Sequence, residues 1–179
     1  MEMIIDKHFR NTVISVVEEL LDEMTNSPAY DRPDLRGGFF VMKLSEGNRP
    51  QFKANDPSIL TVPIGEVPKI TLKYASIATE QANRLLAEFK PIGNQAVSSW
   101  QTRIENEKYA GAILFETNIT VYFGPIAISF SGLPELADEA LMLALGVRMD
   151  WITISEATEI AKISDNRYFR DCFPRYVKK

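Results

Sequence analysis

Apolar residues recur every three or four positions in two long stretches of the chain, and this spacing predicts two amphipathic helices. The first covers residues 5–24 and the second residues 69–89. Pro28 and Pro91 follow them, and proline ends a helix because it lacks a backbone donor. A shorter helix is predicted over residues 96–107, where apolar residues again share one side.

Runs of β-branched and aromatic residues predict strands at residues 39–44, 109–116 and 119–131, with a weaker strand at 50–54. Short turns separate the members of each pair, so two hairpins are expected. Residues 55–69 contain three prolines and are predicted to be a loop, with at most a short strand at Leu60 to Ile64. Gly124-Pro125 falls within the last predicted strand and requires an edge position or a bulge there.

The β-rich run stops at Ser131-Gly132, and a helix is predicted to start at Pro134. Proline fixes the first-turn backbone angle, and acidic residues favour the positive end of the helix dipole. This helix is richer in leucine than one solvated helix needs, so we expect it to be buried, on two sides. A further helix is predicted at 155–163, and residues 166–173 follow it within a helical C-terminal extension.

The order of elements predicts an α+β fold, because two hairpins with helices between them argue for an antiparallel sheet. We expect four to five strands with helices packed on one face, as in profilin-like or PAS-like domains. Residues 1–148 would form one domain, and residues 149–179 a helical extension that packs on the same domain or on a partner.

Composition narrows the function classes. Of the 179 residues, 45% are hydrophobic and 25% charged, as in ordinary globular proteins, and the formal net charge of -4 gives no reason to expect nucleic-acid binding. The single cysteine, Cys172, excludes an internal disulfide and suits a reducing compartment. No signal peptide or membrane-length apolar run is present in this sequence, so a cytoplasmic location is expected, with no membrane partner.

One segment carries a family resemblance. After the predicted strand come Ser131, Gly132, Pro134, Glu135, Asp138, Glu139 and Ala140. This Ser-Gly turn and Pro-Glu-x-x-Asp-Glu-Ala helix start resembles the GlcG/HbpS-like haem-binding (haem-degrading domain) family, and Lys73-Tyr74-Ala75 echoes the start of that family's middle helix. The usual glycine-rich segment before the last hairpin is missing here. The resemblance implies a small-ligand-binding or sensory domain, and haem as a ligand.

If haem binds, the weak cofactor-binding candidates are His8, Tyr74 and Tyr109, with Met42 and Cys172 as further ligand types. His8 is the only histidine, which excludes multi-histidine metal sites, and no cysteine spacing typical of metal sites exists. A structural role for His8, beside the apolar stripe of the first helix, is the favoured interpretation.

Asp138, Glu139 and Glu135 could perform general acid/base chemistry or hold a cation. The favoured alternative is structural: acidic residues in the first turns of a helix stabilise its dipole and solvate its outer face. No catalytic residue is therefore assigned, and an enzyme using Asp138 or Glu139 ranks third among the functions. The aromatic residues of the strands are expected to fill the core, and would line an apolar pocket only if the sheet curved away from the helices. These are Phe39, Phe40, Phe115, Tyr122, Phe123 and Phe130.

Two function hypotheses come first. One is a non-enzymatic domain that binds a small, apolar, haem-related ligand and forms a homo-oligomer. The other is an interaction protein that acts by assembling with itself or with a partner protein, as the apolar excess of residues 136–145 and the helical extension suggest.

Overall fold

The computed structural model describes residues 7–44, 60–67, 71–88, 96–104, 107, 109–116 and 125–178. It contains one five-stranded antiparallel sheet in the order β2-β1-β5-β4-β3. The strands are β1 (Arg36–Leu44), β2 (Leu60–Glu66), β3 (Val97–Ser98), β4 (Ala112–Phe115) and β5 (Ile126–Ser131). The helices are α1 (Lys7–Thr25), α2 (Thr71–Glu88), α3 (Glu135–Arg148), α4 (Ile154–Ile163) and α5 (Arg167–Cys172), with two 3₁₀ turns, η1 (Ser99–Thr102) and η3 (Pro174–Tyr176). The predicted α+β class is confirmed.

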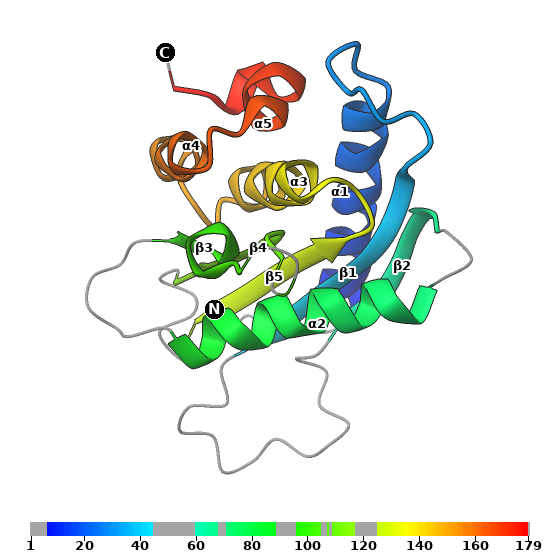
Figure 1. The fold of residues 1–179 in the computed structure, drawn as a ribbon, viewed down its shortest axis with the longest axis vertical. Coiled ribbons are helices and arrows are strands. Elements are labelled where there is room, and N and C mark those ends of the chain that lie inside the picture. Colours follow the sequence, from blue (N-terminus) through cyan, green and yellow to red (C-terminus); the bar gives the residue numbers. More distant parts are fainter. Residues whose placement is uncertain are drawn as a thin grey trace.

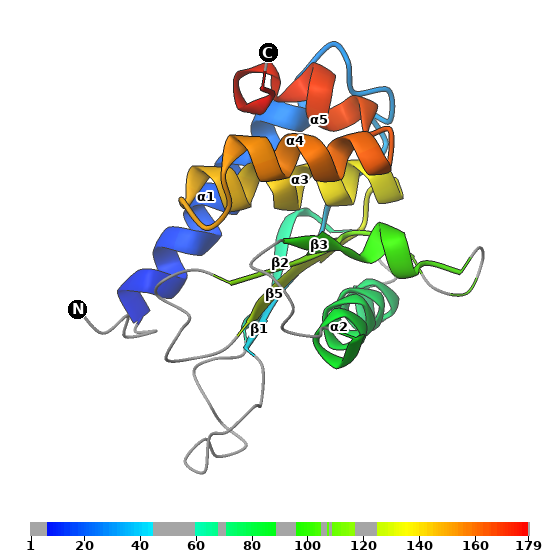
Figure 2. The same cartoon turned by 90° about the vertical axis from the view of Figure 1, so that its left-hand side faces the viewer.

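Helices cover both faces of the sheet, so the expectation of helices on one face was wrong. Among the described helices, Figure 2 shows α2 on one side, and α1, α3 and then α4 and α5 on the other. Two separate apolar clusters match this layering: Val41 and Leu114 pack with Leu85 of α2, whereas Phe40 and Ile128 face the core shared with α1 and α3. Strand residues alternate between these two cores.

Helix α3 is enclosed on both sides, as its leucine content predicts. Figure 1 shows α3 between the sheet and the outer helices α4 and α5. Every residue from Ala137 to Gly146 is buried. Residues 149–178 pack on α1 and α3 of the same chain, and Phe169 and Phe173 of this segment are fully buried in the larger core.

The β5–α3 junction depends on a glycine. Gly132 has φ of 150°, and a Cβ there would lie 2.3 Å from the Gly37 carbonyl oxygen. This close approach brings the end of β5 against β1, where Phe39 pairs with Ser131. The Ser-Gly turn found in the sequence therefore serves strand packing, because only glycine permits both the angle and the contact.

Two predicted segments differ from the structure. The predicted helix at 96–107 is not formed by the described residues 96–104: they contain the short strand β3 and then the single turn η1. The Ser98 hydroxyl accepts from the backbone N–H of Trp100, and the Gln101 side chain accepts from the Ser98 backbone, which caps a short turn. Arg103 then returns to an extended conformation, which ends it. Serine hydroxyls compete with helix hydrogen bonds in this way.

The second difference is β2, which extends to Glu66 although it contains Pro63. The strand lies at the edge of the sheet, where a missing donor costs little because it can face outward. β2 replaces residues 50–54 as the partner of β1 in the N-terminal hairpin; residues 50–54 lie outside the described residues. β5 begins just after Pro125, so this proline does not interrupt the described strand.

Candidate functional site

The three cofactor-binding candidates from the sequence lie apart. His8 is exposed in the first turn of α1, on one side of the sheet, and Tyr74 is half-buried on α2, on the other. Tyr109 precedes β4, and its backbone oxygen accepts a hydrogen bond from Arg84 at 2.5 Å. Met42 and Cys172 are buried in the core on the α1 side. The fold therefore does not bring the candidate side chains together as one ligand set.

The strand aromatics support the core interpretation. Phe40, Phe115 and Phe130 are among the largest fully buried side chains, and Phe115 stacks on Trp151 with ring centroids 5.2 Å apart. Phe39 is half-buried, and Tyr122 and Phe123 lie outside the described residues. The described aromatics fill the space between sheet and helices, and so do not line an apolar pocket.

The acidic residues at the start of α3 differ most from the sequence interpretation. Asp138 and Glu139 do not solvate an outer face: their exposed fractions are 3% and 0%. Glu135 is the residue of the three that stays near the surface, where it pairs with Arg103 at 3.1 Å and accepts the Ala110 backbone N–H at 3.0 Å. The expectation was wrong because α3 is covered on both sides.

Glu139 lies where three parts of the chain meet. Its Oε2 accepts from the hydroxyl of Ser98, at the end of β3, and its Oε1 accepts from the hydroxyl of Ser164, which caps the C-terminus of α4. The Asn166 side-chain amide donates to Oε1 at 3.0 Å and to the Leu136 carbonyl at 2.8 Å. Burial raises the pKa of Glu139 above its ordinary value, against the opposing effect of these three donors.

Asp138 serves the turn before α3. Its Oδ1 accepts the Leu133 backbone N–H at 3.1 Å, and the Gly132 backbone also donates to this carboxyl. Burial raises the pKa of Asp138 well above its ordinary value, against the opposing effect of these two backbone donors. Asp138 lies next to Gly132, the glycine that lets β5 approach β1, so its hydrogen bonds stabilise the backbone of this turn.

The buried carboxylates at the start of α3 are bonded within the chain. Among the described residues, no group of three or more His, Cys, Asp or Glu side chains could hold a metal ion. Glu139 is fully buried, and both of its oxygens accept hydrogen bonds from side chains of the same chain. The network is therefore best explained as a connection between elements.

The partners of Glu139 were missed because each looks like an ordinary cap in the sequence. Ser98 caps η1, and Asn166 caps α5 by accepting from the Phe169 N–H at 3.0 Å. The Ser98 hydroxyl makes the local cap and also donates to Glu139. Asn166 uses its side-chain oxygen for the cap, and its amide nitrogen donates to Glu139. The available signal was a serine or asparagine at a helix terminus, which does not reveal the distant partner.

A second polar connection lies on the α2 side of the sheet. Arg84 has a side-chain exposure of 4%, and it donates to the Thr102 carbonyl at 2.6 Å as well as to the Tyr109 carbonyl. Gln81, also buried, donates to the Ala110 carbonyl at 2.7 Å and accepts from the Ser129 hydroxyl at 2.6 Å. Helix α2 thus fixes the edge segment between β3 and β4 through side chains on its inner flank.

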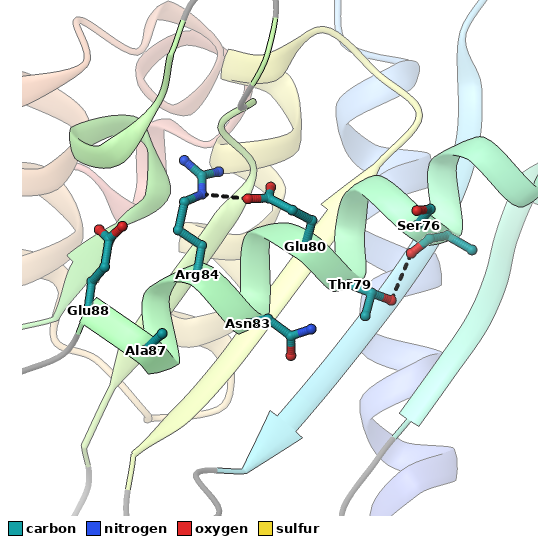
Figure 3. A pocket seen from close by; sticks show the side chains of 8 residues that line it. Ser76, Thr79, Glu80, Asn83, Arg84, Ala87 and Glu88 are labelled. Atoms are coloured by element: carbon teal, nitrogen blue, oxygen red, sulfur yellow. Dashed lines mark hydrogen bonds and ion pairs between the residues drawn. The ribbon is translucent and has the colours of Figure 1, made fainter.

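The outward face of α2 forms a shallow open hollow of about 730 Å³. Short side chains make up much of it, and Figure 3 shows them in a row along the helix, with Glu80 turned toward Arg84, whose Nε lies 3.0 Å from Glu80 Oε1. Thr79 Oγ1 donates to the Ala75 carbonyl at 2.8 Å. The lining residues are Ala75, Ser76, Thr79, Glu80, Asn83, Arg84, Ala87 and Glu88.

Leu72 stands at the N-terminal end of this face and is 86% exposed.

Within the residues that the structure describes, no helix is long and apolar enough to cross a membrane. None of the protein-family models, curated proteins or solved structures compared with this chain matches it. The outward face of α2 is therefore assessed from its own geometry.

Proposed function

We propose that this protein is a non-enzymatic interaction module that assembles with a second copy of itself through the outward face of α2. The observation that carries the proposal is that, among the described elements, α2 is the one that covers its side of the sheet, and it presents short side chains outward (Figure 2). Short side chains allow a second helix to approach closely, because helix separation depends on the residues at the contact. The other long helices have partners within the chain on the opposite side.

The charges on α2 favour a second copy in the antiparallel direction. Lys73 lies near the N-terminal end of the helix and Glu88 at its C-terminal end, and both are exposed. When two such helices run antiparallel about a two-fold axis near the middle, Lys73 of each copy faces Glu88 of the other. The same arrangement brings exposed Leu72 within one helical turn of Ala87 of the other copy, so an apolar side chain lies near the hollow. Glu80 already pairs with Arg84 of its own chain.

This proposal takes the assembly hypothesis from the sequence but moves its location. The apolar excess of residues 136–145, which first suggested an interface, is used inside the chain, since these α3 residues beyond Leu136 are buried. Residues 149–178 also pack on their own chain. Assembly therefore needs a different surface, and α2 offers one.

Sedimentation velocity measures the oligomeric state and so tests the proposal directly. We expect a dimer at micromolar concentration, and we expect Ser76→Arg and Ala87→Arg each to give a monomer, because a long charged side chain prevents close approach of the two helices. Asn11→Arg is the matched control: it places arginine on the exposed face of α1, and the dimer should persist. A wild-type chain that stays monomeric throughout this range would contradict the proposal.

A charge exchange tests the antiparallel pairing. Lys73→Glu should weaken the dimer through like-charge contact with Glu88 of the second copy, and adding Glu88→Lys to the same chain should restore it. Rim charges typically contribute little, so we expect a change of about 3- to 10-fold in the dissociation constant. Two single changes whose effects merely add would argue for a different orientation.

Haem or a related small ligand, expected from the family resemblance, stays a prediction. Titration of the purified chain with haemin, followed at the Soret band, tests it. A shift that saturates at one haemin per chain would support it, and Tyr74→Phe and Tyr109→Phe variants would then identify the ligand.

A further inference from the structure

The last thirty residues of the described chain form a cover, which we call the C-terminal layer and define as residues 149–178. Figure 2 shows α4 and α5 lying over α3 on the side away from the sheet. Residues of this layer fill much of the outer core, with Phe169 and Phe173 fully buried. The layer contacts α1 and α3 rather than α2.

The ties at the rim of the C-terminal layer are exposed ion pairs. Arg167 pairs with Asp31 at 2.6 Å, and Arg175 pairs with Glu23; each of these side chains is between about one third and one half exposed. Exposed pairs contribute little because water and salt screen them. These two ion pairs therefore contribute little to holding the C-terminal layer in place, and neither of them is a buried charge.

The tie at the centre is of a different kind. Glu139 of α3 is fully buried, and two of its three side-chain donors, Ser164 and Asn166, belong to the C-terminal layer. The third, Ser98, belongs to the sheet edge. When the layer is docked, the carboxyl is enclosed by neutral donors; if the layer lifts, Ser164 and Asn166 leave and water reaches the carboxyl.

Charge balance around Glu139 makes docking depend on its proton. On its own helix, the charge that acts on Glu139 is Glu135, which is negative and is already paired with Arg103 from the end of η1. From α4 and α5 the facing groups are the neutral Ser164 and Asn166; Lys162 and Arg167 point elsewhere, to Glu159 and Asp31. A buried carboxylate without a cation is disfavoured relative to its neutral form.

We propose that Glu139 is a proton-dependent latch: the C-terminal layer stays docked while the Glu139 carboxyl is neutral, and opens more often when it is ionised. Opening hydrates the carboxylate, so the ionised form favours the open state by linkage. The sign follows from burial, which raises the pKa of this carboxyl in the docked state above that in water. Docking is then strongest below the ordinary carboxyl range and weakens as pH rises through the raised value.

Cys172 supplies a probe in the wild-type chain. It is the only cysteine, it lies on α5, and it is 5% exposed, so a thiol reagent reaches it when the layer opens. The labelling rate of the urea-unfolded chain divided by that of the folded chain at the same pH gives a protection factor that is free of the reagent's own pH dependence. We expect protection to fall from about pH 5 to about pH 8 in the wild type.

Variants assign this fall to Glu139. Glu139→Gln should keep protection high and nearly constant over the same range, because it removes the charge and keeps the shape. Asp138→Asn, which alters the neighbouring buried carboxyl at the β5–α3 turn, should leave the fall in place. Ser164→Ala provides a second test if Glu139→Gln folds poorly: loss of a donor should lower protection at the higher pH and leave it unchanged at the lower pH.

Hydrogen exchange separates opening of the layer from global unfolding. Amides of α4 and α5 should exchange faster at higher pH, after correction for intrinsic rates, while amides of β1 and β5 should not. Three results would overturn the proposal: constant protection in the wild type, an equal fall in Glu139→Gln, or Cys172 labelling that matches exchange in β1. None of these depends on the α2 face, because the Ala87→Arg monomer can be measured in the same way.

Discussion

Helices α2 and α3 lie on opposite faces of the same sheet but meet different surroundings. Both use their inward sides to cover strands. On its other side, α3 meets α4 and α5, so its residues from Ala137 to Gly146 are all buried. The other side of α2 is open, with Leu72 86% exposed at one end and a shallow hollow along its length.

The difference shows where each helix places its polar groups. Between Ala137 and Gly146, α3 has no side exposed to solvent. The carboxyl groups of Asp138 and Glu139 therefore accept hydrogen bonds from backbone and neutral side-chain donors. α2 keeps Glu80 and Glu88 at the surface and buries Arg84 and Gln81 on its flank, where carbonyls of an edge segment accept from them. A helix enclosed on two sides thus ties elements within the chain, and a helix with a free side can also bind outside it.

The largest expected effect belongs to the apolar core around α3. Leu141→Ala should lower the free energy of unfolding by about 3 to 4 kcal/mol, because Leu141 is fully buried and truncation leaves a cavity. Leu72→Ala on the free face of α2 is the control and should change it by less than about 0.5 kcal/mol. Urea unfolding at low protein concentration measures both without a contribution from association. Equal losses would remove the contrast between the helices.

Arg84→Met should have the next largest effect, a loss of about 2 to 4 kcal/mol. The change keeps apolar volume but leaves the carbonyls of Thr102 and Tyr109 without their donor. Arg170→Met is the matched control, since Arg170 is exposed and pairs with its neighbour Asp171. If both variants unfold at the same urea concentration, Arg84 does not hold the edge segment.

The smallest expected effect is a change in how steeply the free energy of unfolding depends on pH. Burial raises the pKa of Asp138 in the folded chain, so the folded state keeps this proton to higher pH than the unfolded state. Stability is therefore fully present below the ordinary carboxyl pKa and declines as pH rises through the raised value, by at most about 1.4 kcal/mol per pH unit for one proton. Asp138→Asn should flatten the decline.

Glu139 contributes a slope of the same sign, so the two variants are measured together. Glu139→Gln should flatten the global slope in part, and the double variant should flatten it most. Urea midpoints at a series of pH values give these slopes. A slope that is the same in the wild type and the double variant would show that neither carboxyl keeps its proton in the folded chain.

Periodicity predicted the long helices well, because each carries one apolar stripe that matches its contact with the sheet. It failed to show that helices cover both faces. The residues of β5 that face α2 are small: Ala127 packs against that helix, and Ser129 donates to its Gln81. In a sequence, alternation of large and small residues is typical of a strand with one face exposed to solvent. Small residues on that face also allow a helix to pack closely, so the pattern does not distinguish the two cases.

The acidic network could not be predicted for a related reason. Local rules place Asp138 and Glu139 in the first turns of a helix, where exposure and the dipole explain them. Glu139 is enclosed by Ser164 and Asn166 at the ends of α4 and α5, and by Ser98, about forty positions earlier in the chain. Such contacts are set by the tertiary fold. The same holds for Arg84, whose buried hydrogen bonds end on backbone carbonyls that carry no sequence signal.

The pairing of β1 with β5 also bears on how the chain is synthesised. Phe39 meets Ser131 across the middle of the sheet, so the two central strands are separated by roughly 90 positions of sequence. During translation β1 can pair only with β2 until β5 has left the ribosome, and its second edge stays open for that time. A chain that stops before residue 126 would keep that edge open, and we expect such fragments to aggregate rather than to fold as a smaller domain.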